Sequence, residues 1–281
     1  LVGSEMCIRD RELTERGARA NGGTSYDRTN YYETFPSSEE NLEWAISLEA
    51  DRMINSFISA EDLESEMTVV RNEMESGENS PLRILRERVQ SASYLWHNYG
   101  QSIIGARSDV ENVPIERLKQ FYKKYYQPDN AVLVIAGKFD EERAKEFIIA
   151  EFGTIPAPIR SGSNVIYPTY TEDPPQDGER TVTLRRKGET QFVMASYHVP
   201  AGSHEEFPAI DIMNHALSAP PSGRLHRSLV ETGLAANVAA SAPQLREAGL
   251  SLIFAEVRND RELDMVWDLS LIHISEPTRP Y

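Results

Sequence analysis

One short pattern occurs twice, and it constrains the fold more than any other feature of the chain. Residues 15–21 read ERGARAN and residues 231–237 read ETGLAAN, so Glu, Gly, Ala and Asn recur at the same spacing. After each copy the hydropathy pattern predicts the same order of elements, namely a helix end, a strand, a turn, a strand and a helix. The sequence therefore predicts two tandem copies of one unit built from helices and strands.

The expected elements follow from apolar spacing and from Gly, Pro and Asn punctuation. In the first copy we expect strands at 19–26 and 29–35, helices at 36–57, 59–78, 81–95, 115–126 and 140–152, a loop at 96–114, and a buried strand at 131–137. In the second copy we expect strands at 181–186, 191–199, 235–242 and 249–257, helices at 204–217 and 222–231, and a helix that begins at Asp260. Residues 12–155 then form a first lobe, 156–179 a proline-rich linker, and 180–268 the start of a second lobe.

The two ends of the chain are expected to be sequencing-adapter read-through rather than protein. One DNA element encodes the first residues, LVGSEMCIRD, and its reverse complement encodes LSLIHISEPT near the end. Residues 1–11 and 269–281 are therefore set aside. In the second copy, two strands and a helix at 181–217 precede the repeat. The first copy should have the same elements before residue 12, and we expect that truncation removed them.

Composition excludes several classes of protein. The formal net charge is −15, which argues against nucleic acid or an anionic membrane surface as a partner. The single Cys lies in the first ten residues, so residues 12–268 offer no disulfide framework and no thiolate metal site. No apolar run is long enough to span a bilayer.

The helix expected at 59–78 carries the most suggestive chemistry. Leu63, Glu66, Val69, Val70 and Glu73 follow the i, i+3, i+4, i+7 spacing and share one face. Carboxylates are costly to bury unless a positive group meets them. Two interpretations stay open: Glu66 and Glu73 lie at a solvated edge of the stripe, or one is a metal ligand and the other supports it.

The segment ANGGTS at 20–25 also allows two interpretations. Asn and Gly are poor strand formers, and glycine in a strand often marks the close approach of another backbone. The segment is either a flexible hairpin edge or a sheet edge left open for an extended peptide.

Four segments together resemble the pitrilysin/insulinase family of inverted-motif zinc metallopeptidases, whose zinc motif is H-x-x-E-H. They are GARANGGTSYDRTNYYETF at 17–35, EMTVVRNEMESGENSP at 66–81, HNYGQSIIG at 97–105 and YYQPDNAVLVIAG at 125–137. The resemblance implies an α+β fold of tandem lobes, each a mostly antiparallel sheet packed with helices. It also implies that the first lobe lacks its N-terminal strands and helix and that the second is cut short.

The resemblance further implies a Zn²⁺-dependent metalloendopeptidase that hydrolyses peptides or unfolded segments bound as an added β-strand. Glu73 matches the family's third zinc ligand, and Glu66 matches the acid that supports the site. The strand that holds substrate is matched by Asn21, Gly22, Gly23 and Thr24.

The chain departs from the family in one respect, because it contains no H-x-x-E-H. Its interior histidines are interpreted as structural or surface residues: His97, His198, His204, His215 and His226. The general base and two ligands would then lie in the missing segment, and this chain alone would be inactive and bind no zinc tightly. The alternatives are a non-catalytic homologue that acts as a scaffold, or a peptide-binding subunit. Expected partners are a peptide or unfolded protein, and the remaining lobes or a homologous subunit; the compartment is open, with periplasm favoured over cytoplasm.

Overall fold

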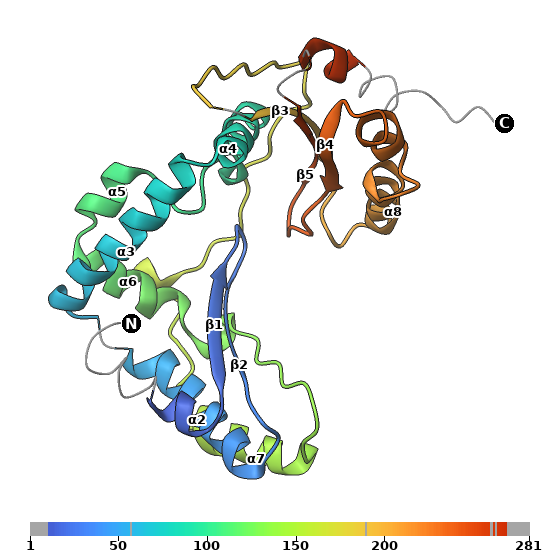
Figure 1. The fold of residues 1–281 in the computed structure, drawn as a ribbon. Coiled ribbons are helices and arrows are strands. Elements are labelled where there is room, and N and C mark those ends of the chain that lie inside the picture. The colour runs from blue at the N-terminus through green and yellow to red at the C-terminus, as the bar shows by residue number, and fades with distance from the viewer. Residues whose placement is uncertain (1–10, 57, 189, 259–260, 262, 269–281) are drawn as a thin grey trace. The chain divides into compact units, whose positions relative to one another are not determined.

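The computed structural model describes residues 11–56, 58–188, 190–258, 261 and 263–268 (Figure 1). The predictions for both ends, for Phe57 and for Asp260 lie outside the described residues, apart from Arg11. The chain divides into two compact units. The first contains Leu1–Glu73 and Ile104–Tyr170, and the second contains Met74–Ile103 and Thr171–Tyr281.

The first unit is built around a β-hairpin. Strand β1 (Arg19–Thr24) pairs antiparallel with β2 (Thr29–Thr34), with Gly22 opposite Tyr31. The turn is closed by the backbone N–H of Ser25, which donates to the carbonyl of Arg28 at 2.8 Å. The two strands form a two-stranded sheet, so each has an edge without a strand partner among the described residues.

Two helices of this unit begin with the expected capping chemistry. The Ser38 hydroxyl accepts a hydrogen bond from the N–H of Asn41 and starts α2 (Glu39–Asn55), while Asp140 caps α7 (Glu141–Phe152). Leu42 and Ile46 of α2 pack against Ala144 and Phe147 of α7 to form a small core. The unit also contains α5 (Arg107–Asn112) and α6 (Ile115–Tyr125), and α3 (Ala60–Glu78) begins in it.

Three local predictions were wrong. Residues 131–136 and 181–186 form no strand, because the described residues provide no neighbouring strand to which their backbones could bond. The expected loop at 96–114 contains the short helix α5 and a 3₁₀ turn at Asn98–Gly100. Residues 131–136 are extended and connect α6 to α7 as a plain tube in Figure 1.

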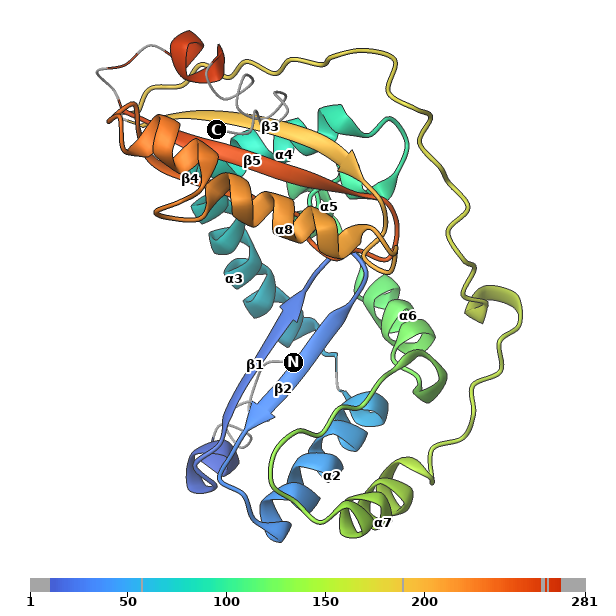
Figure 2. The ribbon, with the colours of Figure 1, turned by 90° about the vertical axis from the view of Figure 1, so that its right-hand side faces the viewer.

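The second unit holds a three-stranded antiparallel sheet in the order β3-β5-β4. Its strands are β3 (Gln191–Val199), β4 (Ala235–Ser241) and β5 (Gly249–Val257), and β3 pairs with β5 from Gln191 opposite Val257 to Val199 opposite Gly249. Helix α8 (Phe207–Ser218) lies on one face, and α4 (Pro81–Ser93) packs against β3 on the other (Figure 2). Together with the hairpin unit, this arrangement confirms the predicted α+β class.

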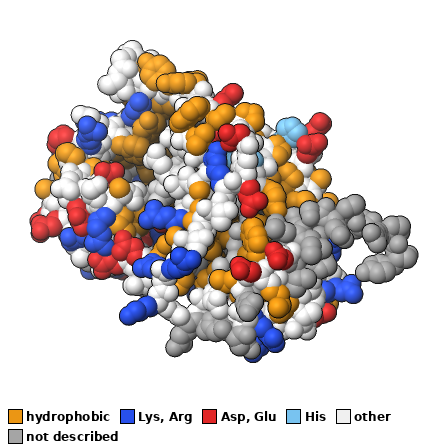
Figure 3. Space-filling view, turned by 90° about the horizontal axis from the view of Figure 1, so that it is seen from above, with side chains coloured by type: hydrophobic (Ala, Val, Ile, Leu, Met, Phe, Trp, Pro, Cys, Tyr) orange, Lys and Arg blue, Asp and Glu red, His pale blue; other side chains and the backbone are white. Residues whose placement is uncertain are grey.

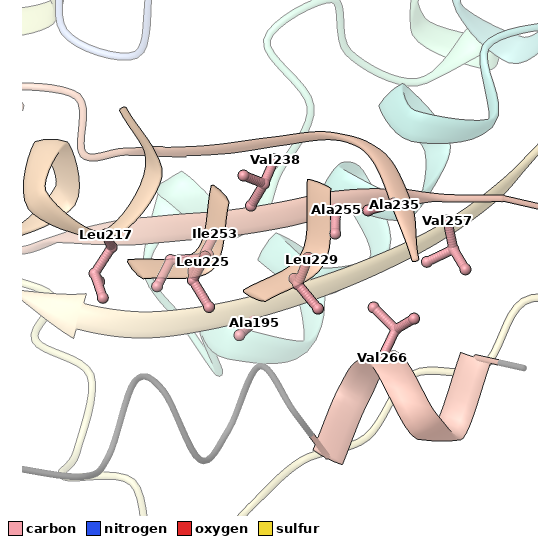
Figure 4. Close-up of a cluster of buried hydrophobic side chains, with 10 residues drawn as sticks. All are labelled: Ala195, Leu217, Leu225, Leu229, Ala235, Val238, Ile253, Ala255, Val257 and Val266. Atoms are coloured by element: carbon pink, nitrogen blue, oxygen red, sulfur yellow. The ribbon is translucent and has the colours of Figure 1, made fainter. Parts of the chain in front are cut away.

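The core of the second unit lies between the sheet and the helices that follow β3. Leu225 and Leu229 belong to a helical turn before β4 and are fully buried. Figure 4 shows Leu229 beside Ala255 of β5 and Val266 pointing toward Val257. The large apolar contribution of β5 agrees with its position in the centre of the sheet.

The internal repeat has a matching backbone geometry in both units. Gly17 and Gly233 both have positive φ, at 64° and 73°. In each copy the residue after the glycine donates its N–H five residues back, Ala18 to Leu13 at 2.7 Å and Leu234 to Leu229 at 2.9 Å. Both helices therefore end in the same left-handed glycine cap, which requires no Cβ, before the first strand of a hairpin. By this correspondence β1 and β2 match β4 and β5.

Candidate functional site

The two carboxylates singled out by spacing lie on α3, where the structure leaves them accessible to solvent. Glu66 is half-buried and Glu73 is exposed, while Val69 between them is also exposed, at 56%. Seven residues correspond to about 10.5 Å along a helix and to nearly two full turns. The two side chains therefore share a face but lie too far apart to bind one metal ion together, which is compatible with one ligand and one supporting acid.

The described residues do not form a complete zinc site. They contain no group of three or more His, Cys, Asp or Glu side chains that could hold a metal ion. A catalytic zinc needs three protein ligands and an open position. Glu73 has suitable chemistry for one of these ligands, and the described part of the chain does not complete a group of three around it.

The predicted substrate strand is β1, and all six of its residues are exposed. The side-chain oxygen of Asn21 accepts a hydrogen bond from the N–H of Gly22 at 2.8 Å. A Cβ at Gly22 would lie 3.2 Å from the Tyr31 ring and 3.3 Å from the Asn30 carbonyl, so glycine fits tightly against β2 there. At Gly23 the nearest atom would be 3.5 Å away, which is an ordinary contact. Thr24 ends the strand.

The sequence reasoning missed an arginine that ties β2 to α2. Arg52 forms ion pairs with Glu33 of β2 at 3.0 Å and with Glu49 at 2.8 Å, and its guanidinium lies 4.5 Å from the centre of the Tyr31 ring. The side chains of Arg52 and Glu33 are 11% and 6% exposed. The ion pair of Arg52 with Glu49 could have been predicted from the sequence, because the two residues are three positions apart on one helix. The contacts of Arg52 with β2 could not, because they depend on the tertiary fold.

The tyrosine hydroxyls of the same unit form a second link between β2 and the helices. The hydroxyls of Tyr31 and Tyr126 lie 2.7 Å apart. Burial, followed by the hydrogen bond with Tyr31, raises the pKa of Tyr126 well above its ordinary value. Tyr122 donates its hydroxyl proton to the carbonyl of Arg52 at 2.7 Å. These contacts explain Tyr122 of α6 and Tyr126, which follows the helix, as structural residues, because their hydroxyls join elements.

In the second unit, His97 has a structural environment. Its Nδ1 accepts the N–H of Tyr99 at 3.2 Å, and its Nε2 lies 2.5 Å from a carboxylate oxygen of Glu247. Since Nδ1 is an acceptor here, the Nε2 proton is the one donated to Glu247. His198 is similarly engaged, with Nε2 3.1 Å from the carbonyl of Ser93.

Asp173 holds the loop around His97. Its two oxygens accept the backbone N–H groups of Leu95, Trp96 and His97 at 2.7–2.9 Å. Burial alone would raise the pKa of Asp173, but these three donors outweigh it and lower the pKa below the ordinary aspartate value. The HNYGQSIIG segment is therefore anchored by a charged side chain from the chain that follows residue 156.

The surface shows mixed charge. On the face that Figure 3 shows, acidic and basic side chains are interspersed with exposed hydrophobic ones. None of the described helices is both long enough and apolar enough to cross a membrane.

Comparison with protein families identifies two matching models. One, described as the peptidase M16 inactive domain, matches residues 112–269, and another, described as insulinase (peptidase family M16), matches residues 9–107. Among similar proteins, the zinc protease PqqE of Helicobacter pylori is 28% identical over 250 residues, which cover 88% of this chain and 55% of that protein. The uncharacterized zinc protease YmxG of Bacillus subtilis is 25% identical over 249 residues, which cover 87% of this chain and 58% of that protein.

Solved structures agree with this comparison. A protease from Helicobacter pylori matches with a TM-score of 0.86 at 26% identity, over 93% of this chain and 63% of that one. An M16-like peptidase from Alicyclobacillus acidocaldarius matches with a TM-score of 0.77 at 20% identity, over 97% and 63%, and supports the fold alone. The chain spans little more than half the length of the curated relatives to which it is similar.

Proposed function

Because the chain belongs to the pitrilysin/insulinase (M16) family of peptidases, we propose that it is part of a zinc-dependent metalloendopeptidase. Its substrates are peptides or unfolded segments, which bind as an added strand along β1. Zn²⁺ is the cofactor of the full-length protein, with Glu73 as one ligand and Glu66 as the acid that supports the site. This chain by itself is inactive, because it supplies one ligand of three.

The observation that carries the proposal is the pair of carboxylates on α3. Glu66 and Glu73 lie two turns apart on one face, and neither is fully buried. This spacing is compatible with one metal ligand and one supporting acid. Helix α3 also lies within the part of the chain that matches the insulinase model.

The strand β1 supports the substrate half of the proposal. Its outer edge carries backbone N–H and C=O groups with no strand partner among the described residues. An extended peptide can bond to such an edge through its own backbone, which selects for conformation more than for sequence. Small residues at Gly22 and Gly23 leave room for that backbone to approach.

The ligand assignment is tested by Glu73→Gln in the full-length protein. We expect zinc content, measured by metal analysis after dialysis, to fall from about one per protein to well below that, since a neutral amide is a poorer ligand than a carboxylate. Glu64→Gln, an exposed glutamate on the same helix, is the matched control and should keep its zinc. Unchanged zinc in Glu73→Gln would refute the assignment.

A second measurement separates the enzyme from its alternatives. Residues 12–268, purified alone, should bind no stoichiometric zinc, and one tightly bound zinc per chain would contradict the proposed division of ligands. If the full-length protein has neither H-x-x-E-H nor zinc, the non-catalytic scaffold or peptide-binding subunit becomes the better explanation. The further partners, the remaining lobes or a homologous subunit, and the periplasmic location stay predictions.

A further inference from the structure

Strand β1 contains a dipeptide with a chemistry that the proposed function does not use. Asn21 is followed by Gly22, and none of the other asparagines in the sequence precedes a glycine. The side-chain amide of an asparagine can react with the backbone nitrogen of the next residue. The reaction is easiest before glycine, because glycine has no side chain to shield that nitrogen. Since both residues are also exposed, the pair is a candidate site of covalent modification.

The pairing of β1 with β2 places the Gly22 nitrogen on the outer edge of the hairpin. The N–H of Ser25 donates to the carbonyl of Arg28, so these two residues form a hydrogen-bonded pair next to the turn. Hydrogen-bonded and non-hydrogen-bonded pairs alternate along an antiparallel ladder. Three positions back along the chain, Gly22 opposite Tyr31 is a pair of the second kind. Its N–H therefore points away from β2, toward the edge that has no strand partner among the described residues.

The side chain of Asn21 lies against this nitrogen. Its Oδ1 accepts the N–H of Gly22 at 2.8 Å. The amide carbon Cγ is bonded to that oxygen, so the nitrogen and the carbon that would join are already neighbours. Solvent reaches both residues because they are exposed. Holding two reacting groups close together removes part of the entropic barrier to their reaction, so this strand geometry favours the reaction.

We propose that Asn21 is a self-modification site, at which the chain converts an asparagine of β1 into aspartate and isoaspartate. The Gly22 nitrogen loses its proton to solvent and attacks Cγ. The new N–Cγ bond closes a cyclic imide, and the side-chain nitrogen takes up a proton and leaves as ammonia. Water then opens the imide at either of its two carbonyl groups. One opening gives aspartate, and the other gives isoaspartate, whose backbone runs through the former Cβ.

Both products change the outer edge of β1. Each adds one negative charge to a chain whose formal net charge is already −15. Isoaspartate also inserts a carbon atom into the backbone, so the strand can no longer keep its ladder with β2 in register on both sides of residue 21. The proposed function assigns this edge to substrate, but the modification itself needs neither zinc nor peptidase activity.

The second copy of the repeat supplies a matched control within the same chain. Asn237 has the position of Asn21 in the repeat, and it is also exposed and lies in a strand, β4. The next residue is Val238, which is 6% exposed and branched at Cβ. Its side chain shields the backbone nitrogen, so Asn237 should stay intact. The two asparagines share their place in the repeat and differ in the residue that follows.

The test follows both asparagines in the whole chain, which is kept at mildly alkaline pH. Trypsin releases residues 20–28 and 228–246, each of which contains a single asparagine. Mass spectrometry should show the acid form accumulating in the first fragment, at least about tenfold faster than in the second. Electron-transfer fragmentation identifies the isoaspartate. The same chain unfolded in urea gives the rate without the strand, and we expect the folded rate to lie within about tenfold of it.

Two variants locate the cause. Gly22→Ala places a methyl group beside the attacking nitrogen and should slow the conversion of Asn21 at least about tenfold. Gly23→Ala, one residue further along, leaves that nitrogen unshielded, so Asn21 should react as in the parent chain. The Cβ of Gly22→Ala also crowds the Tyr31 ring. If this variant does not fold, the comparison of the folded parent chain with the unfolded one still decides the question.

Three results overturn the proposal. One is a folded chain in which Asn21 reacts more than about tenfold more slowly than in urea, because the strand would then protect it. Another is conversion of Asn237 at the same rate as Asn21. The third is a folded Gly22→Ala chain that reacts as fast as the parent chain.

Discussion

Arg52 provides the sharpest test of how the first unit is held together. Its replacement by Met keeps the apolar stem but removes the charge that the Glu33 and Glu49 carboxylates meet at 3.0 and 2.8 Å. Glu33 is 6% exposed, so Arg52→Met removes a positive charge from beside a buried carboxylate. Removing one member of a buried ion pair costs about 3–5 kcal/mol, which is more than about a hundredfold in the opening equilibrium of β2.

The matched control is Arg143→Met in the same unit. Arg143 also pairs with two carboxylates, Glu39 and Glu146, and also lies over a ring, that of Phe147 at 4.8 Å. The two arginines therefore have the same kinds of contacts and differ in burial, since the Arg143 side chain is 46% exposed. We expect its replacement to have a much smaller effect, because water screens exposed pairs.

The assay is hydrogen exchange at increasing urea, followed by mass spectrometry of the fragments that contain β2 and α2. This assay reports the stability of the first unit alone. Tryptophan fluorescence would mix signals from both units, because Trp44 lies in the first and Trp96 and Trp267 lie in the second. The double variant Arg52→Met with Glu33→Gln should recover part of the lost stability, because the buried negative charge of Glu33 is then removed too. A loss below about 1 kcal/mol in Arg52→Met, or equal losses at Arg52 and Arg143, would refute the claim that burial makes this pair important.

Three further outcomes follow from other parts of the structure. Leu229→Ala opens a cavity in the fully buried core of the second unit, so urea denaturation should show a loss of about 2–5 kcal/mol, and a loss below about 1 kcal/mol would mean that the core collapses around it. Asp173 has a lowered pKa, so its contribution to stability is present above the ordinary aspartate pKa of about 3.9 and is lost as the pH falls through the lower folded value. Asp173→Asn should therefore flatten the decline in thermal stability below about pH 4, and an unchanged acid profile would contradict the anchoring role. Gly23→Ala should leave the stability of the hairpin unchanged or raise it slightly, whereas Gly22→Ala should lower it because the new Cβ crowds the Tyr31 ring. Hydrogen exchange of β1 measures both effects. Faster exchange in Gly23→Ala than in Gly22→Ala would show that the register of β1 with β2 is wrong.

The elements predicted from sequence are those whose causes are local. Ser38 supplies a cap for α2 within three residues, and the Pro81 start of α4 follows Ser80 directly. Strands β3 and β5 combine β-forming residues with partners supplied by the same unit, and their predicted bounds agree with the structure. In each case a short window contains the physical reason for the element.

Residues 131–136 show where such a window fails. Their apolar run predicts a buried strand, and the backbone is indeed extended with Ile135 in a core. A strand, however, is defined by hydrogen bonds to a neighbour, and hydropathy cannot tell whether that neighbour is present. Val132 and Val134 are exposed because the described residues provide no strand beside this segment that would cover them.

In the candidate site, too, the relations within one element were predictable and the contacts between elements were not. Glu66 and Glu73 share a face because helix periodicity requires it, and that relation needs no tertiary information. The ligands that would complete a metal site come from a different segment, which spacing within this helix cannot supply. The link from Arg52 to Glu33 was likewise missed, because the two residues meet only once β2 lies against α2.

The two copies of the repeat reach similar hairpins with different kinds of stabilisation. In the second unit β5 is almost wholly buried between two strands and two layers of helices, so apolar burial holds it. In the first unit β2 is largely exposed, and its described contacts with the helices are an ion pair, a cation–π contact and a tyrosine pair. The Arg52 and Glu33 side chains are 11% and 6% exposed, so salt screens this pair far less than it screens an exposed pair such as Arg143 with Glu39. Increasing sodium chloride should therefore change hydrogen exchange in β2 little more than in β5.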